Sequence, residues 1–196
     1  MQTERQQEII NVALEIISTA GIQGLTIKNI SKRIGISEPA IYRHFDSKIH
    51  ILTSILEQLK NDSLKIFSDK LSDSASSTSS IDRINKLFTE HFRMFTQKPE
   101  LSSVLFSEEL FQNENILRNK VAEVIDNNSN ILLSIIVSGQ ENDELRNDLK
   151  PEHIAIMIMG TLRLFVKKWQ FSGFKFNLEE EGTQIINMIK TLIEKR

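Results

Sequence analysis

The chain has 196 residues, of which 40% are hydrophobic and 26% charged, with a formal net charge of −2 at pH 7. This length and composition suit one domain or two small ones with a packed core. There is no cysteine, which excludes disulfides, cysteine-based zinc sites and a thiol nucleophile. A polar N-terminus without a signal peptide, and no apolar run near the ~20 residues of a membrane span, lead us to expect a cytoplasmic protein with no membrane partner.

The first predicted helix covers residues 3–20, where apolar side chains recur at helical spacing. Gly21 follows it and is predicted to be a left-handed C-terminal cap. Thr26 is a good N-cap for a second helix over residues 27–34. The chain thus begins with an amphipathic helix and a short second one.

A tight turn at Gly35 separates the second helix from a third one that runs to about His44. Ser37 is expected to cap this third helix, and Pro39 lies in its first turn, where a missing N–H costs nothing. Two short helices joined by a tight turn are typical of a helix-turn-helix, which we place at about residues 26–45.

Apolar stripes at helical spacing predict six further helices. They are expected over residues 47–71, 81–96, 99–111, about 114–138, 151–171 and 178–193. The small polar stretch at residues 72–80 is predicted to be a loop and is the best candidate domain boundary by composition. With only three prolines and seven glycines in the whole chain, the sequence predicts an all-α fold of about nine helices.

The net charge is unevenly distributed. Five basic residues stand against two acidic ones between Gly24 and Lys48, a local net charge of +3 that leaves −5 for the rest of the chain. Attraction to phosphates acts within about a Debye length of ~8–10 Å, so a local basic face on an acidic body is compatible with DNA binding.

One segment carries a family pattern. It reads Thr26-Ile27-x-x-Ile30-Ser31-x-x-Ile34-Gly35-Ile36-Ser37, then Ala40-Ile41-Tyr42-x-His44-Phe45-x-Ser47-Lys48-x-x-Ile51-Leu52. The N-terminal ~60 residues resemble the DNA-binding domain of the TetR/AcrR transcriptional regulators. Ser31 stands where that family usually has alanine. Ile49 and His50 stand where acidic residues are common.

The resemblance implies a domain organisation. It suggests a three-helix, homeodomain-like helix-turn-helix DNA-binding domain over residues 1–48. A helical effector-binding and dimerisation domain would cover residues 49–196, and the helix at residues 47–71 would connect the two. The implied partners are double-stranded operator DNA and a second copy of the chain.

The third helix carries small residues together with an aromatic hydroxyl, an arginine and a histidine. Arginine pairs with guanine or binds phosphate, and tyrosine and histidine suit phosphate oxygens. Helix N-termini are themselves anion sites. With the family positions that contact phosphate, the candidate DNA-binding residues are Thr26, Lys28, Ser37, Glu38, Pro39, Ala40, Tyr42, Arg43, His44 and Lys48. The alternatives are that Thr26 and Ser37 only cap helices and that Tyr42 only packs.

The helix at residues 151–171 is apolar nearly all around, which predicts burial on more than one side. In the resembled family the last two helices of each subunit form a four-helix dimer interface. Two recognition helices related by a twofold axis read a palindrome. The candidate dimer residues are Ile158, Leu162, Ile185, Ile189 and Leu192.

The middle of the chain is rich in phenylalanine, and family members often bind a small hydrophobic or amphipathic effector there. The candidate lining is Phe88, His91, Phe92, Phe95, Leu105, Phe111, Arg118, Val121, Ile125, Phe165 and Trp169. The alternative is that these side chains are plain core, since aromatic stripes at helical spacing usually are.

An enzyme is not indicated. The four histidines lack metal-ligand spacing, and neither a nucleophile elbow nor a glycine-rich phosphate loop occurs, so we expect no metal and no cofactor. We predict a dimeric repressor that binds a palindromic operator and is released by a hydrophobic effector. The alternative is an effector-independent DNA-binding or interaction protein on the same fold.

Overall fold

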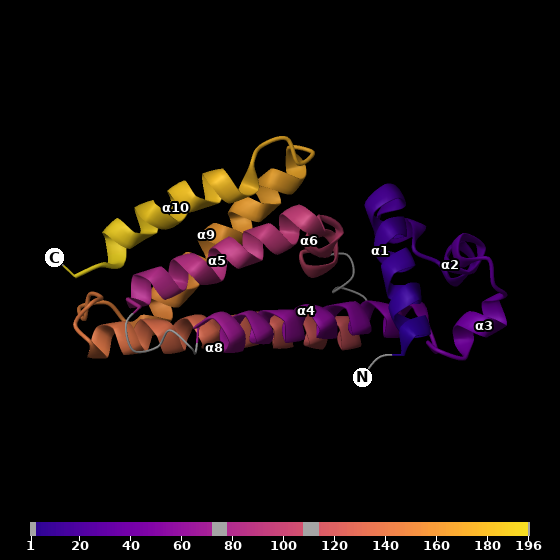
Figure 1. The fold of residues 1–196 in the computed structure, drawn as a ribbon, viewed down its shortest axis with the longest axis horizontal. Coiled ribbons are helices and arrows are strands. Elements are labelled where there is room, and N and C mark those ends of the chain that lie inside the picture. The colour runs from indigo at the N-terminus through magenta and orange to yellow at the C-terminus, as the bar shows by residue number, and fades with distance from the viewer. Residues whose placement is uncertain (1–2, 72–77, 108–113, 196) are drawn as a thin grey trace. The chain divides into compact units, whose positions relative to one another are not determined.

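The computed structural model describes residues 3–71, 78–107 and 114–195 (Figure 1). Over these residues the regular structure is helical, apart from one isolated antiparallel bridge between Leu145 and Glu194. This confirms the predicted all-α fold. The helices are α1 (Glu4–Gly24), α2 (Ile27–Ile34), α3 (Glu38–Tyr42), α4 (Lys48–Leu71), α5 (Ser80–Gln97), α6 (Glu100–Leu105), α8 (Asn115–Glu141), α9 (Pro151–Phe171) and α10 (Leu178–Ile193).

The end of the first helix differs from the prediction. Gly21 adopts a φ of 66° and a ψ of −178°, which breaks the helix, but a further turn follows and α1 ends at Gly24. The expectation that Gly21 is the terminal cap was therefore wrong. Leu25 is instead the C-cap, and its N–H donates to the carbonyl of Ile22 at 3.2 Å.

In contrast to α1, two helices are shorter than predicted. α3 ends at Tyr42 rather than His44, because Arg43 and His44 form a turn that leads to α4. The predicted helix over residues 99–111 is described only as α6, which ends at Leu105 where Phe106 leaves the helical region with φ −111° and ψ 18°. Phe111 lies outside the described residues.

The chain divides into two compact units. The first comprises Met1–Leu59 and Lys98–Val124. Within it α2 packs on α1 and α3, and α6 packs on α1. Its core is mainly aliphatic and includes Ile9, Ile10, Leu25, Ile30, Ile41, Phe45, Ile51 and Leu52, each at most 1% exposed. These side chains hold the helix-turn-helix segment on α1 and α4.

The second unit comprises Lys60–Gln97 and Ile125–Arg196. α10 runs alongside α5 and also packs on α9 (Figure 1). A close approach between α10 and α5 is at Gly182, where a Cβ would overlap the ring of Phe92. The end of α10 is hydrogen-bonded to the segment between α8 and α9, since the N–H of Arg146 donates to the carbonyl of Ile193 at 2.9 Å. The α4 and α8 helices each contribute residues to both units, and a domain boundary after residue 48 stays a prediction.

Candidate nucleic-acid interface

The turn between α2 and α3 is built by backbone geometry. Gly35 adopts the left-handed conformation (φ 82°, ψ 29°), which few residues other than glycine take without strain. The N–H groups of Gly35 and Ile36 both donate to the carbonyl of Ser31, at 2.9 and 3.1 Å. The buried hydroxyl of Ser31 donates in turn to the carbonyl of Lys28 at 2.9 Å, so a serine is accommodated here.

Thr26 caps α2 as predicted. Its side-chain oxygen accepts from the N–H of Asn29 at 3.1 Å, with Thr26 itself in an extended conformation. The Asn29 side-chain amide donates to the carbonyl of Gly24 at 2.8 Å, which joins the start of α2 to the end of α1. The first turn of α2 is thereby fixed, and the exposed side chain of Lys28 extends from it.

Ser37 occupies the N-cap position of α3, but the prediction of a side-chain cap was wrong. A capping hydroxyl accepts from the second or third N–H of the helix. The second residue is Pro39, which has no N–H, and the N–H of the third, Ala40, donates to the backbone carbonyl of Ser37 at 2.9 Å. The exposed Ser37 hydroxyl therefore makes no capping bond.

The α3 helix presents a mixed outer face. Ile41 is fully buried, and Phe45, just past the helix, is 1% exposed, so these two residues anchor the segment in the core. Tyr42 is 50% exposed, although it is aromatic, and Arg43 is exposed beside it. Glu38 and Pro39 are exposed, while Ala40 and His44 are half-buried. The predicted recognition residues thus share one short surface segment of the first unit.

Lys48 has a contact that the sequence did not reveal. Its ammonium group donates to the carbonyl of Ile22 at 3.0 Å, just beyond the break in α1. Its side chain is half-buried. Lys48 therefore ties the start of α4 to the end of α1, whatever else it contacts.

Gln6 is a residue of this region that the sequence reasoning missed. Its side-chain amide donates to the backbone carbonyl of His44, 38 positions away, at 3.3 Å. The sequence carried a signal, because Thr3 and Gln6 have the spacing of a capping box, and that box is present in α1. The contact with His44 depends on the fold and has no sequence signal.

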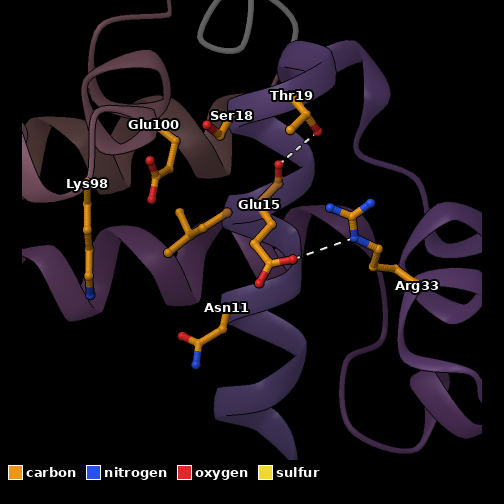
Figure 2. A pocket seen from close by; sticks show the side chains of 8 residues that line it. Asn11, Glu15, Ser18, Thr19, Arg33, Lys98 and Glu100 are labelled. Carbon is orange, nitrogen blue, oxygen red and sulfur yellow. Dashed lines mark hydrogen bonds and ion pairs between the residues drawn. The ribbon is translucent and has the colours of Figure 1, made fainter.

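An open cleft of about 600 Å³ lies elsewhere in the first unit, along α1 (Figure 2). It is lined by Asn11, Leu14, Glu15, Ser18, Thr19, Arg33, Lys98 and Glu100. Figure 2 shows Glu15 directed toward Arg33, and their charged groups are 3.5 Å apart. With two acidic and two basic residues in its lining, the cleft has no net preference for an anion, unlike the α2–α3 segment.

The predicted effector-lining residues fall into both units. Leu105, Arg118 and Val121 belong to the first unit, and Arg118 is exposed and donates to the side chain of Asn115 at 2.6 Å. The second unit contains Phe88, His91, Phe92, Phe95, Ile125, Phe165 and Trp169. The aromatic rings there pack on each other, with Phe92 and Phe165 edge to face at 5.9 Å.

His91 is a polar group among these aromatic residues. Its Nδ1 lies 2.7 Å from the carbonyl of Leu87, which only accepts, so Nδ1 carries the proton. Its Nε2 then accepts from the buried hydroxyl of Ser63 at 3.3 Å. Desolvation lowers the pKa of His91, although the Leu87 carbonyl and the charge of Glu90 act in the opposite direction. His91 is therefore neutral around pH 7, and both of its ring nitrogens have hydrogen-bond partners within the protein.

Three of the five predicted dimer residues are buried in the single chain. Ile158, Leu162 and Ile189 are at most 4% exposed in the single chain, because they face the core of their own unit. Ile185 is half-buried, and Leu192 is 48% exposed. The apolar residues that α9 and α10 do expose are Ile156, Met157, Leu164, Phe171, Met188 and Leu192.

Two further classes of site are absent from the described ranges. No helix within residues 3–71, 78–107 and 114–195 combines the length and apolar character that a bilayer crossing needs. Over the same ranges no group of three or more histidine, aspartate or glutamate side chains is arranged to hold a metal ion.

Comparisons with known proteins identify a family for this chain. The model of the bacterial regulatory proteins of the tetR family matches residues 9–55, and that of the YsiA-like protein C-terminal region, also of TetR type, matches residues 60–192. The fatty acid metabolism regulator protein of Bacillus subtilis is 22% identical over 192 residues, which is 98% of this chain and 97% of that protein.

Two solved structures share the fold. The fatty acid degradation regulator FadR from Bacillus halodurans has a TM-score of 0.80 at 23% identity, covering 98% of this chain and 95% of that one. The transcriptional regulator FadR from Bacillus subtilis, solved in complex with stearoyl-CoA, has a TM-score of 0.78 at 24% identity, covering 95% and 96%. The chain belongs to the TetR family of bacterial regulatory proteins and is a DNA-binding transcriptional regulator.

Proposed function

We propose that this protein is a cytoplasmic repressor that binds a palindromic operator as a homodimer and is released by an acyl thioester of coenzyme A. Residues 1–48 would form the DNA-binding domain, and residues 49–196 the effector-binding and dimerisation domain. The single observation that carries the DNA-binding part is the outward face of α3. Ile41 and Phe45 are fixed in the core while Tyr42, half exposed, and Arg43 face outward.

The candidate DNA-binding residues of α2, α3 and α4 have different proposed roles. Arg43 is the candidate for bidentate pairing with guanine, and Tyr42 and His44 are candidates for phosphate oxygens. Thr26 and Lys28 would contact the backbone beside the groove at the capped start of α2, where helix amides favour an anion. The short or flat side chains of Ser37, Pro39 and Ala40 would allow close approach to the bases. Glu38 and Lys48 are the two remaining candidate DNA-binding residues.

The exposed faces of α9 and α10 are the proposed dimer interface. Ile156, Gly160 and Leu164 follow one another at four-residue intervals on α9, and Met188 and Leu192 do so on α10. All four apolar side chains are at least 48% exposed in the single chain. A Cβ at Gly160 would meet no atom within 4 Å, so a partner helix could approach closely there. Covering this face with a second copy would remove the apolar surface from water.

The proposed effector class is amphipathic, with a long apolar chain and an anionic head. Support comes from the buried aromatic side chains of the second unit, the full-length match to a fatty acid metabolism regulator, and the similar fold solved with stearoyl-CoA. The candidate contacts are those predicted residues that lie in this unit, Phe88, His91, Phe92, Phe95, Ile125, Phe165 and Trp169. Binding would favour one conformation of the dimer and so change the match of the two recognition helices to their half-sites.

Operator titration tests the DNA-binding part. A duplex selected by the wild-type protein from random DNA is titrated across a salt series with wild type, Tyr42→Ala and Tyr42→Phe. We expect steep salt dependence for the wild type and a loss of about tenfold or more for Tyr42→Ala. Leu64→Ala, which truncates an exposed side chain of α4 in the second unit, is the control. Equal binding by Tyr42→Ala and wild type would exclude α3 as the recognition helix.

Release of the same duplex tests the effector part. Stearoyl-CoA, palmitoyl-CoA and free coenzyme A are added to the preformed complex, and the thermal midpoint of the protein is measured with each. The acyl thioesters should release DNA and raise the midpoint, while coenzyme A alone should do neither. No release by either thioester would favour the effector-independent alternative.

A further inference from the structure

We propose that Gln6 is a positioning residue for DNA recognition, because its amide links the N-terminal cap of α1 to the exit of the recognition helix. The inference rests on the proposed function of α3. Gln6 lies outside the set of residues assigned to DNA, and it acts through the backbone of His44 rather than through a contact with the operator.

The two ends of the Gln6 amide have different partners. Its Oε1 accepts from the backbone N–H of Thr3 at 3.0 Å and from the Thr3 hydroxyl at 3.4 Å. The Thr3 hydroxyl accepts in turn from the N–H of Gln6 at 3.2 Å. The Nε2 then points the other way and donates to the carbonyl of His44 at 3.3 Å. The Thr3 N–H needs an acceptor and the His44 carbonyl needs a donor, so a single amide orientation satisfies both.

The His44 carbonyl lies where the recognition segment needs an external partner. α3 ends at Tyr42, and His44 lies in the turn two residues beyond it. The carbonyl of Ile41 accepts from the N–H groups of His44 and Phe45, at 2.9 and 3.0 Å. Further along this turn, the carbonyl of His44 accepts from the Gln6 amide. The Gln6 amide thereby fixes the backbone directly beside Tyr42 and Arg43.

Glutamine is required here for a chemical reason. A capping box accepts glutamate or glutamine at this position, since either supplies the acceptor for the N-cap N–H. Only glutamine also offers a donor. A glutamate would keep the box with Thr3 and set a carboxylate oxygen against the His44 carbonyl oxygen. The substitution Gln6→Glu thus separates the two roles of this side chain.

A matched set of variants tests the proposal. Gln6→Glu removes the donor, and Gln7→Glu adds the same charge one residue later in the same turn of α1, where the Gln7 amide contacts only Asn11 among the hydrogen bonds described. Thr3→Ala removes the capping hydroxyl, together with its bond to the Gln6 Oε1, and keeps the Gln6 Nε2 as the donor to His44. Gln6→Met removes the donor without adding charge. Each variant is titrated against the selected duplex and a scrambled duplex, well below its thermal midpoint.

We expect Gln6→Glu and Gln6→Met to lower the ratio of specific to scrambled binding by about 5–10-fold, with the salt slope kept. Gln7→Glu should lower both affinities equally, and Thr3→Ala should lower the thermal midpoint without changing the ratio. A ratio for Gln6→Glu or Gln6→Met equal to that of Gln7→Glu would overturn the positioning role. A wild-type protein that selects no duplex would instead contradict the proposed function, and the positioning role with it.

Discussion

The ammonium nitrogen of Lys48, the first residue of α4, lies 3.0 Å from the carbonyl oxygen of Ile22, one residue past the break in α1. The same carbonyl accepts from the N–H of Leu25. A residue that the family resemblance assigns to DNA phosphate is thus also part of the scaffold. The two roles make different predictions for binding and for stability.

Lys48→Met should reduce both DNA affinity and stability. Loss of one phosphate contact per subunit lowers the salt slope of a dimer by about 2. Loss of the donor to Ile22 lowers the free energy of unfolding by about 1 kcal/mol per subunit. Salt-dependent titration of the selected duplex and urea denaturation measure the two effects separately.

Lys28→Met is the matched variant, because Lys28 is exposed at the capped start of α2. Lys28→Met should lower the salt slope of DNA binding by the same amount. Its free energy of unfolding should stay within about 0.5 kcal/mol of the wild-type value. A Lys48→Met protein with an unaltered salt slope would assign Lys48 to the scaffold alone.

Leu164→Glu should dissociate the proposed dimer. Leu164 is 71% exposed on α9, so a carboxylate at this position is tolerated in the single chain. In a twofold interface each subunit would bury one such carboxylate without a positively charged partner. We expect the dimer dissociation constant to rise at least about 100-fold and operator binding to fall with it. Sedimentation equilibrium and duplex titration give the two readouts. Ile116→Glu, at a 63% exposed site on α8 in the first unit, should leave the dimer intact.

Acid should destabilise the protein through His91. Burial lowers the pKa of His91 in the folded state, so the unfolded chain binds more protons between the folded pKa and the ordinary value of about 6.5. The stabilisation from the neutral ring is therefore complete above pH ~6.5 and is lost as the pH falls below that value. When the pH is lowered from 7.5 to 5.5, the thermal midpoint of His91→Gln should fall by a few degrees less than that of the wild type.

His153→Gln is the control for that series, since His153 is exposed near the start of α9. It should follow the wild-type profile throughout. If His91→Gln shows the full wild-type loss, other groups account for the acid sensitivity.

Gly182→Ala should destabilise the second unit. The new methyl group would overlap the ring of Phe92, which is 2% exposed and held edge to face by Phe165, so the ring has little room to move. Overpacking of this kind costs ~1–3 kcal/mol, and the better helix propensity of alanine recovers part of it. A net loss of about 1–2 kcal/mol in urea denaturation is expected. Glu181→Ala, at the exposed neighbouring position, should stay within about 0.5 kcal/mol.

The sequence by itself determined the helices and the helix-turn-helix. Apolar spacing and end signals such as Thr26 and Gly35 act within a few residues, so α2 could be placed with its correct bounds and the turn after it identified. The outward face of α3 followed in the same way, because burial of Ile41 and Phe45 leaves Tyr42 and Arg43 on the opposite side. These are local properties of the chain.

Only the tertiary structure decided which apolar residues remain exposed and which polar groups meet over long separations. Spacing alone cannot tell whether Ile158 or Ile156 of α9 faces the core, since the helix is apolar nearly all around. In the folded second unit Ile158 is buried and Ile156 is 70% exposed. The contacts of Gln6 with His44 and of Lys48 with Ile22 join residues 38 and 26 positions apart. Such contacts depend on how α1 packs in the first unit, and no local pattern encodes them.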